Sequence, residues 1–176
     1  MRIQRIEEFK ISRRKRKAIG ELLGRCFPEY PGQRTYYKQI PAFRYLVWAD
    51  QRLVGHLAVE HRMMNVGGEI ASIFGIVDLC VDQEFQSRKI ASQLLQTLED
   101  LGRKHKIDFL VLAAQEYELY ENNGFHLVSN TCRWLMINEH QTLGVNHRSI
   151  DDCLMVKALG SKQWKSGLVD FLGHVF

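Results

Sequence analysis

The sequence predicts an α/β protein of the α+β kind, in which one mixed sheet of about seven strands carries helices on both faces. Three apolar, β-branched runs follow one another across short turns, which is typical of an antiparallel meander. The third run, an amphipathic helix and a further apolar run then follow in direct succession, which predicts a central parallel crossover in a mostly antiparallel sheet. With 176 residues the chain can bury a substantial core, so residues 1–176 are expected to form a single domain.

The N-terminal part of the chain predicts a strand followed by a helix. Apolar and polar residues alternate in MRIQRIEEF, which indicates a short first strand. Ser12 can cap a helix over roughly residues 13–27. The apolar side of this helix is formed by Ala18, Ile19, Leu22 and Leu23. The sequence PEYPG at 28–32 ends it, and residues 33–40 form either another short helix or a turn.

Three consecutive strands are predicted next, at residues 43–49, 53–64 and 70–81. The sequence DQR forms the first turn between them, and Gly67 and Gly68 supply the positive φ angles of the second turn. The third strand is apolar on both faces, which indicates a central strand that is covered on both sides.

The crossover helix is predicted directly after the sequence QSRKIA at 86–91. Its apolar residues fall at helical spacing and are Ile90, Ala91, Leu94, Leu95, Leu98 and Leu101. Gly102 and the cations of GRKHK end the helix. The apolar run 107–114 follows as a strand parallel to 70–81, and a ligand is expected at the carboxyl ends of such strands.

The C-terminal third predicts a short helix in QEYELYENNGF that stops at Gly124. Strands follow at 125–138 and 151–159, with a loop at 139–150 between them. The apolar tail at 164–176 is expected to cover the core, with a homodimer contact as the alternative.

Composition excludes several classes of function. No apolar run can span a bilayer and the N-terminus is charged where a signal peptide needs an apolar region, so a cytoplasmic protein with no membrane contact is predicted. The four cysteines form no CxxC pair and the seven histidines lack ligand spacing, so no metal site is predicted. The net charge is +4, and the run RRKRK at 13–17 favours a solvated helix start. No nucleic-acid motif accompanies this run, so no nucleic-acid partner is predicted, and nucleic-acid binding is kept only as a rival hypothesis that rests on RRKRK.

The loop QSRKIA before the crossover helix could bind an anion. The first turn of a helix presents backbone N–H groups and a positive dipole end, where a pyrophosphate can bind. Arg88 and Lys89 add positive charge, and the small Ala91 allows close approach. The alternative is an ordinary polar connection between a strand and a helix.

The unit VDQEFQSRKIASQLL resembles motif A of the GCN5-related N-acetyltransferase (GNAT) superfamily, in which Gln or Arg is followed by two residues, Gly, one residue, and Gly or Ala. Gln86 and Ala91 match this pattern, whereas Lys89 replaces the first glycine and could crowd the phosphates or contact them. A second departure is Ala114, where many members have an Asn that contacts the pantetheine chain.

The sequence ELYENNGF resembles the second signature of the same superfamily, a Tyr four residues before Gly-Phe or Gly-Trp. Tyr120, Gly124 and Phe125 match it. Within the superfamily, the Gly-His strand, the glycine-containing hairpin and the altered motif A are most similar to aminoglycoside 2′-N-acetyltransferases and nodulation N-acyltransferases. The resemblance implies a GNAT-like fold and the transfer of an acetyl or longer acyl group from a coenzyme A (CoA) thioester, with acetyl-CoA as cosubstrate, to a primary amine of a small molecule.

The resemblance also implies roles for particular residues, with direct attack in a ternary complex. The pyrophosphate-binding backbone is expected at Gln86, Ser87, Arg88, Lys89, Ile90 and Ala91. The pantetheine-binding backbone is expected at Leu79, Cys80 and Val81, with the N–H of Leu79 or Cys80 stabilising the oxyanion. Tyr30, Tyr36 and Tyr37 are expected near the acceptor amine.

Two residues are the candidate acid and base. Asp78 lies inside an otherwise apolar strand, where a carboxylate is costly unless it is paired or functional, and it is the first candidate base. Glu60 and His61 are the alternatives. Tyr120 can protonate the leaving thiolate. A non-catalytic acyl-CoA-binding module of the same fold is the alternative function.

Overall fold

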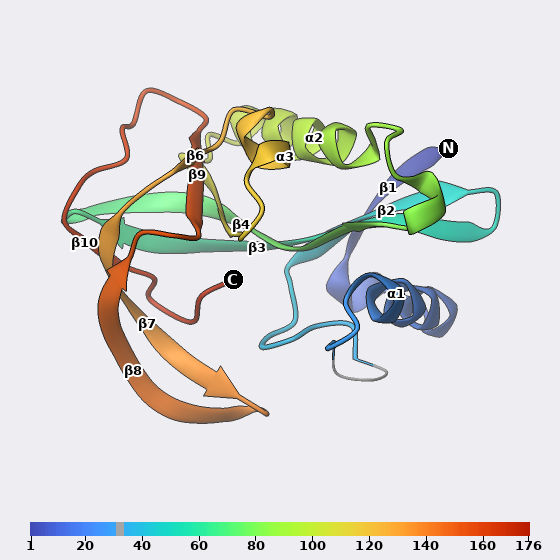
Figure 1. Cartoon of the computed structure of the whole chain (residues 1–176), viewed down its shortest axis with the longest axis horizontal. Helices are drawn as coiled ribbons and strands as arrows, with labels where there is room; N and C mark the ends of the chain where they lie inside the picture. Colours follow the sequence, from blue (N-terminus) through green and yellow to red (C-terminus); the bar gives the residue numbers. More distant parts are fainter. Residues whose placement is uncertain (31–33) are drawn as a thin grey trace. The chain divides into compact units, whose positions relative to one another are not determined.

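The computed structural model describes residues 1–30 and 34–176 as a mixed α/β structure (Figure 1). The strands are β1 (Arg2–Glu7), β2 (Phe43–Ala49), β3 (Arg52–Val66), β4 (Glu69–Val81), β5 (Phe109–Ala113), β6 (His126–Leu127), β7 (Asn130–Asn138), β8 (Gln141–Ile150), β9 (Leu154–Ala158) and β10 (Leu168–Asp170). The helices are α1 (Arg13–Cys26), α2 (Ile90–Lys104) and α3 (Glu118–Glu121), with short 3-10 turns η1 (Glu8–Lys10) and η2 (Gln83–Phe85). Among the described residues, no helix is both long and apolar enough to cross a membrane.

The strands form one mixed sheet, and the predicted fold class is confirmed. The order is β6-β9-β5-β4-β3-β10-β7-β8, with β2 paired to β3 and β1 paired to β2. The predicted parallel crossover joins β4 to β5, with Ile73 opposite Phe109 and Gly75 opposite Val111. A second parallel pair, β10 with β7, was not predicted.

The chain divides into two compact units. Unit 1 comprises residues 1–60 and 76–95, and unit 2 comprises residues 61–75 and 96–176. Strands β3 and β4 and helix α2 each contribute residues to both units. That residues 1–176 act as a single domain stays a prediction.

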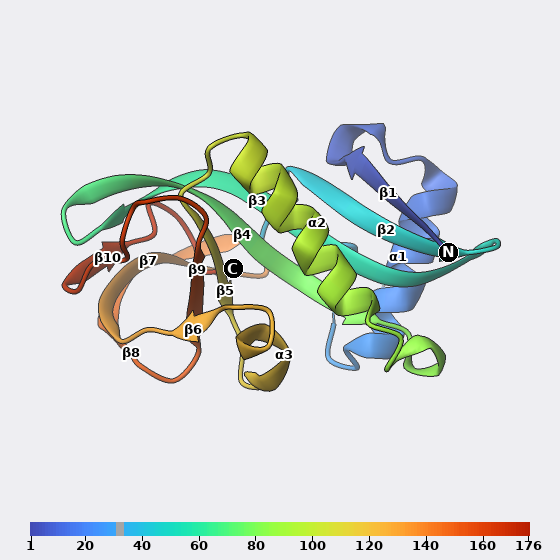
Figure 2. The same ribbon diagram turned by 90° about the horizontal axis from the view of Figure 1, so that it is seen from above.

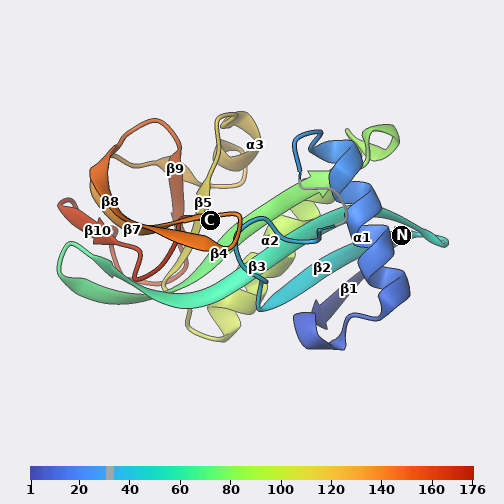
Figure 3. The same ribbon diagram turned by 90° about the horizontal axis from the view of Figure 1, so that it is seen from below.

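In unit 1, helices cover both faces of the sheet. The Ser12 hydroxyl accepts a hydrogen bond from the Lys15 N–H at 3.4 Å, which confirms the predicted cap of α1. The apolar side of α1 covers one face (Figure 3), in a core formed by Ile6, Ile19, Leu22, Leu23, Leu46, Leu53 and Cys80. The start of α2 covers the other face (Figure 2), where a Cβ atom at Gly55 would lie 3.0 Å from Ile90 Cγ2. Glycine in β3 therefore allows α2 to begin close to the sheet.

The predicted segment between α1 and β2 is partly described. Residues 31–33, which belong to the predicted terminator PEYPG and the segment after it, lie outside the described residues. Residues 34–40 contain bends and no helix, which favours the turn over the second short helix.

The run RRKRK forms the first turns of α1, where Arg16 pairs with Glu8 and Lys17 with Glu21.

In unit 2, the predicted loop at 139–150 is wrong. This segment is strand β8, which pairs with β7 in a long curved hairpin (Figure 1). Glu139 and His140 form the tight turn, with φ angles of 45° and 61°. Such left-handed turns usually contain Gly or Asn, so the sequence offered no turn signal between the two strands. The strand predicted at 125–138 is divided into β6 and β7.

The C-terminal tail covers the core of unit 2, as predicted. Val169 of β10 and Phe171 are completely buried. A Cβ atom at Gly75 would lie 2.0 Å from Cε1 of Phe176, so the Phe176 ring rests directly on the glycine backbone of β4. The ring is also 4.2 Å from the Arg62 guanidinium.

Candidate active site

Asp78 interrupts β4. Its φ angle is 50°, a left-handed conformation that within a strand is typical of a β-bulge. The side chain is half-buried, and Oδ2 accepts a hydrogen bond from the Tyr30 hydroxyl at 2.8 Å. Burial raises the pKa of Asp78, while the bond from Tyr30 and the Arg44 charge lower it in part. Burial and Asp78 in turn raise the pKa of Tyr30, so the phenol stays protonated.

A chain of buried polar side chains lies behind Asp78. Arg44 and His56 are completely buried, and Glu8 is 6% exposed. Arg44 Nε donates to Glu8 Oε2 at 2.6 Å, and Arg44 Nη1 lies 2.9 Å from His56 Nε2. His56 Nδ1 lies 2.8 Å from the Asp78 carbonyl oxygen.

These partners define the protonation state of His56. A guanidinium can only donate, so Nε2 accepts from Arg44 and Nδ1 carries the hydrogen that it donates to the carbonyl of Asp78. Burial, followed by the Arg44 charge, lowers the pKa of His56 to about 3, so the ring is neutral at physiological pH. Arg44 Nη2 is also buried and makes no hydrogen bond within residues 1–30 and 34–176.

The residues after Asp78 continue β4. Leu79 and Val81 are half-buried and Cys80 is 8% exposed. A hydrogen bond with Cys26, together with burial, raises the pKa of the Cys80 thiol well above its usual value. Cys80 is therefore a protonated thiol and an unsuitable nucleophile.

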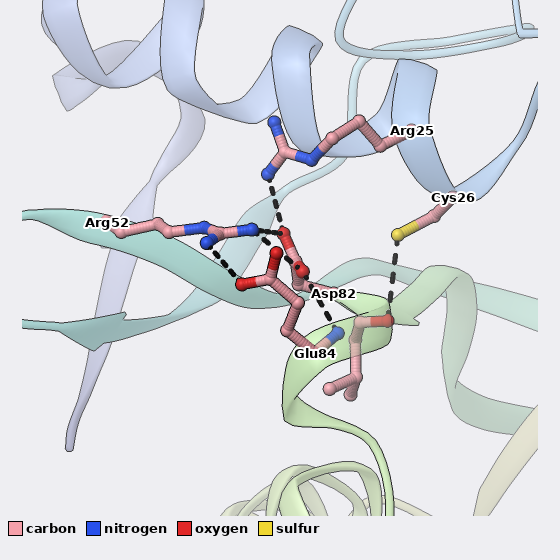
Figure 4. Close-up of polar contacts among 6 residues, drawn as sticks. Arg25, Cys26, Arg52, Asp82 and Glu84 are labelled. Atoms are coloured by element: carbon pink, nitrogen blue, oxygen red, sulfur yellow. Dashed lines mark hydrogen bonds and ion pairs between the residues drawn. The ribbon is translucent and has the colours of Figure 1, made fainter.

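Asp82 holds the end of β4 in place (Figure 4). It is 3% exposed and accepts hydrogen bonds from Arg25 at 2.8 Å and from Arg52 at 2.9 and 3.0 Å. Burial alone would raise the pKa of Asp82, but the bonds from Arg52 and Arg25 outweigh it and lower the pKa. Arg52 also donates to Glu84 at 2.6 Å, which fixes η2 just before the loop. Sequence reasoning missed this cluster, although Asp82 directly follows an apolar strand.

The loop between η2 and α2 has the backbone of an anion-binding turn. Ser87 and Lys89 have φ angles of 62° and 59°, the left-handed region that glycine normally occupies. Lys89 stands where motif A has its glycine and adopts the conformation that a glycine would provide. The carbonyl of Lys89 accepts from the Gln93 N–H at 3.0 Å, so α2 begins here with its positive dipole end. The exposed side chains of Arg88 and Lys89 add charge, and the residues present fit a phosphate group.

Replacing Lys89 by Gly is expected to stabilise the protein. A left-handed residue with a Cβ atom is strained by about 1–2 kcal/mol. Relief of this strain exceeds the entropy cost of a glycine in the unfolded chain, and the net gain in the free energy of unfolding is about 0.5–1 kcal/mol. A rise in Tm by a few degrees in thermal denaturation would therefore follow. Lys17→Gly, in the right-handed interior of α1, is the matched control and should lower Tm. Equal losses of Tm in both variants would contradict the strained turn.

Tyr120 lies in unit 2, in α3. The residue is half-buried, and burial, followed by the Glu116 charge, raises the pKa of Tyr120. The second signature is one local structure: the Phe125 N–H donates to the Tyr120 carbonyl at 3.0 Å, the rings lie 5.9 Å apart, and Gly124 has a φ of 80°. Ala114 donates its N–H to the Cys153 carbonyl at 2.9 Å.

The other candidate residues differ in their exposure and contacts. His61 is exposed and packs against the Phe74 ring at 5.3 Å. In unit 1, Glu60 is close enough for its charge to raise the pKa of Asp78. Tyr37 is 53% exposed, with its ring 6.1 Å from that of Tyr30. Asp78, the strand residues 79–81 and the loop 86–91 thus belong to unit 1.

Comparison with known families agrees with this architecture. Residues 10–128 match the acetyltransferase (GNAT) domain family, which is more than half of the chain. The chain belongs to the GNAT family. Acetyl-CoA is the cosubstrate of this family.

Several solved structures share the fold. A GNAT family N-acetyltransferase (YhbS) from Escherichia coli, in complex with CoA, is 19% identical, with a TM-score of 0.64 over 96% of this chain and 89% of that one. ElaA from Escherichia coli is 18% identical, with a TM-score of 0.62 over 89% and 98% of the two chains. The ribosomal-protein-S18-alanine N-acetyltransferase from Escherichia coli is 11% identical, with a TM-score of 0.58 over 92% and 97%. No curated protein sequence shows significant similarity to this GNAT chain.

Proposed function

We propose that this GNAT protein is an N-acyltransferase that moves an acetyl or other acyl group from a CoA thioester to a primary amine of a small molecule. The observation that carries the proposal is the loop 86–91, whose left-handed turns at Ser87 and Lys89 precede the positive end of α2. The alternative function, a non-catalytic acyl-CoA-binding module, is suggested by Lys89 and Ala114, which depart from the family motifs. Lys89 supports this alternative less strongly, because it adopts the backbone conformation that a glycine would provide.

The cosubstrate would be held by backbone groups of unit 1. The pyrophosphate would bind to the N–H groups of residues 86–91, and the pantetheine chain to the backbone of Leu79, Cys80 and Val81. Acetyl-CoA supplies an acyl group that is activated as a thioester. The C–S bond of the thioester breaks as the new C–N bond forms. The N–H of Leu79 or Cys80 would stabilise the negative charge that develops on the carbonyl oxygen.

Asp78 and Tyr120 would move the protons. The acceptor arrives as an ammonium group, and Asp78 removes one proton to free the nitrogen lone pair. The nitrogen loses a second proton when the amide forms, and Tyr120 donates one to the leaving thiolate. One proton is released to solvent per turnover. The role of Tyr120 is inferred from its motif, and its raised pKa suits an acid that stays protonated at neutral pH.

The acceptor is proposed to be a cationic amine such as an aminosugar or a polyamine. Asp78 and Glu60 provide negative charge in unit 1, and the Tyr30 and Tyr37 rings provide aromatic surface for an ammonium group. A nearer relation to the aminoglycoside 2′-N-acetyltransferases and nodulation N-acyltransferases, a cytoplasmic location and a homodimer contact stay predictions from the sequence.

Binding of acetyl-CoA is expected to raise Tm. At a ligand concentration 100 times Kd, binding adds about 2.7 kcal/mol to the free energy of unfolding. For a chain of this size this corresponds to about 5–10 °C. No rise in Tm at millimolar acetyl-CoA would contradict the proposed cosubstrate.

A pair of variants tests the location of the phosphate site. Ala91→Asp places a carboxylate in the first turn of α2, where the dipole tolerates it in the free protein but a bound phosphate would be repelled. Ala91→Asn adds nearly the same volume without the charge. The acetyl-CoA-dependent rise in Tm should disappear in the first variant and persist in the second. The same rise in both would place the phosphates elsewhere.

A further inference from the structure

We propose that His56 is a positioning residue, which fixes the direction of the Leu79 N–H through a hydrogen bond to the Asp78 carbonyl. The proposal rests on the function proposed above, in which the Leu79 N–H is a donor to the thioester oxygen. His56 itself is completely buried and is too far inside the protein to be a catalytic residue in the strict sense.

The geometry of one peptide unit carries the proposal. The peptide bonds of the described residues are trans, so the C=O of Asp78 and the N–H of Leu79 point in opposite directions within one plane. His56 Nδ1–H binds the carbonyl oxygen of that plane at 2.8 Å. Holding the oxygen toward His56 therefore directs the Leu79 N–H away from it.

The left-handed conformation of Asp78 needs such a support. Asp78 has a φ of 50°, a conformation that is strained for a residue with a side chain, so the peptide after it would otherwise relax toward an ordinary strand. A donor on its carbonyl also polarises the peptide and makes the N–H on the other side a stronger donor.

The support is itself rigid. His56 Nε2 accepts from Arg44 Nη1 at 2.9 Å, and Arg44 Nε is bound to Glu8 Oε2 at 2.6 Å. Three elements, η1, β2 and β3, thus contribute one residue each to a continuous buried chain. Because Arg44 can only donate, it keeps the hydrogen of His56 on Nδ1, the nitrogen that faces Asp78.

Two variants separate positioning from general stability. His56→Leu removes the donor to Asp78, whereas His56→Asn retains an N–H close to the position of Nδ1–H. The direct readout is the infrared stretch of bound acetyl-CoA labelled with ¹³C at the thioester carbonyl. In the wild type the stretch should lie lower than in free acetyl-CoA. This lowering should be lost in His56→Leu and largely restored in His56→Asn.

Kinetics and binding provide the second readout. Removal of one oxyanion donor typically lowers kcat by about 100–1,000-fold, and we expect His56→Leu to approach the lower value, with substantial recovery in His56→Asn. Free CoA has no thioester carbonyl, so its Kd should be similar in all three proteins. Val169→Ala, in the buried core of unit 2, controls for a general loss of stability and should keep the carbonyl shift.

The outcomes are distinguishable. A wild-type carbonyl shift that persists in His56→Leu, or the same loss in both His56 variants, would overturn the positioning role alone. Failure of the wild type to bind acetyl-CoA would overturn the proposed function and this inference with it. If His56→Leu does not fold, ¹⁵N NMR of the wild-type ring still decides, because an Nε2–H tautomer would overturn the proposal.

Discussion

Replacing Asp78 by Asn is expected to lower kcat by at least about 100-fold, because general base catalysis contributes about 100–10,000-fold to enzymatic rates. The amide is the same size and can still accept a hydrogen bond from Tyr30, so the fold and the Kd for CoA should change little. Asp100→Asn, on the exposed side of α2, is the matched control and should leave kcat unchanged.

The pH dependence of kcat tests the same role of Asp78. Burial raises the pKa of Asp78 above the ordinary value for an aspartate, about 3.9. Its ionised form therefore becomes populated only at higher pH than in an exposed aspartate. Activity should fall as the pH falls through this raised pKa, since the protonated carboxyl cannot accept a proton. Asp78→Asn should lack this acidic limb in a pH profile of its residual activity.

The alternative base gives a different pattern. If Glu60 accepts the proton, Glu60→Gln should remove the acidic limb and Asp78→Asn should retain it. If Asp78 is the base, Glu60→Gln should move the limb to lower pH, because the Glu60 charge contributes to the raised pKa of Asp78. Near wild-type kcat in Asp78→Asn would exclude Asp78.

Replacing Arg44 by Met is expected to lower the free energy of unfolding by about 3–5 kcal/mol, because removal of one partner from a buried ion pair leaves the other charge uncompensated. Glu8 would keep its ion pair with Arg16, which is 3.1 Å away and whose side chain is 45% exposed. His56 would lose the donor to its Nε2. Thermal denaturation should show a fall in Tm of about 6–20 °C.

Two further variants test the origin of this loss. Arg13→Met removes an exposed charge from the first turn of α1 and should change stability by no more than about 0.5 kcal/mol. The double variant Glu8→Leu/Arg44→Met removes both charges of the buried pair and should recover part of the stability lost in Arg44→Met. A loss below about 1 kcal/mol in Arg44→Met would show that water or Arg16 already compensates Glu8.

Local patterns predicted much of the fold. The strand at 43–49 has the predicted bounds, and the crossover from β4 through α2 to β5 followed from apolar runs that alternate with a helical period. Strand β8 could not be predicted in the same way. Its turn is formed by Glu139 and His140, which carry no glycine signal, and its side chains are mostly exposed, so no apolar pattern marks it.

The candidate site was predicted in part. Asp78 was singled out as a charge inside an otherwise apolar strand, and the structure adds its partner Tyr30. The chain from Glu8 through Arg44 to His56 was missed because its members come from three elements with no common spacing. Arg44 in FRYLVWA and His56 in LVGHLAV are also polar residues inside apolar strands, so the argument that found Asp78 could have found them.

The structure explains how Lys89 can stand in place of the glycine of motif A. Sequence alone left open whether Lys89 crowds the phosphates or contacts them, because a residue type does not reveal its φ angle. With a φ of 59°, Lys89 preserves the turn at the cost of local strain and adds an exposed cation beside it. The altered motif is therefore compatible with an intact phosphate-binding backbone.

The central claim is acyl transfer to an amine, and the most direct test is amine-dependent release of free CoA thiol from acetyl-CoA. A panel of aminosugars, polyamines and simple primary amines would be assayed by thiol detection, with mass spectrometry of the products. We predict thiol release only when an amine is present, with one N-acetylated amine formed per thiol. Binding of acetyl-CoA without amine-dependent release across the panel and across pH would contradict the enzyme and favour the non-catalytic module.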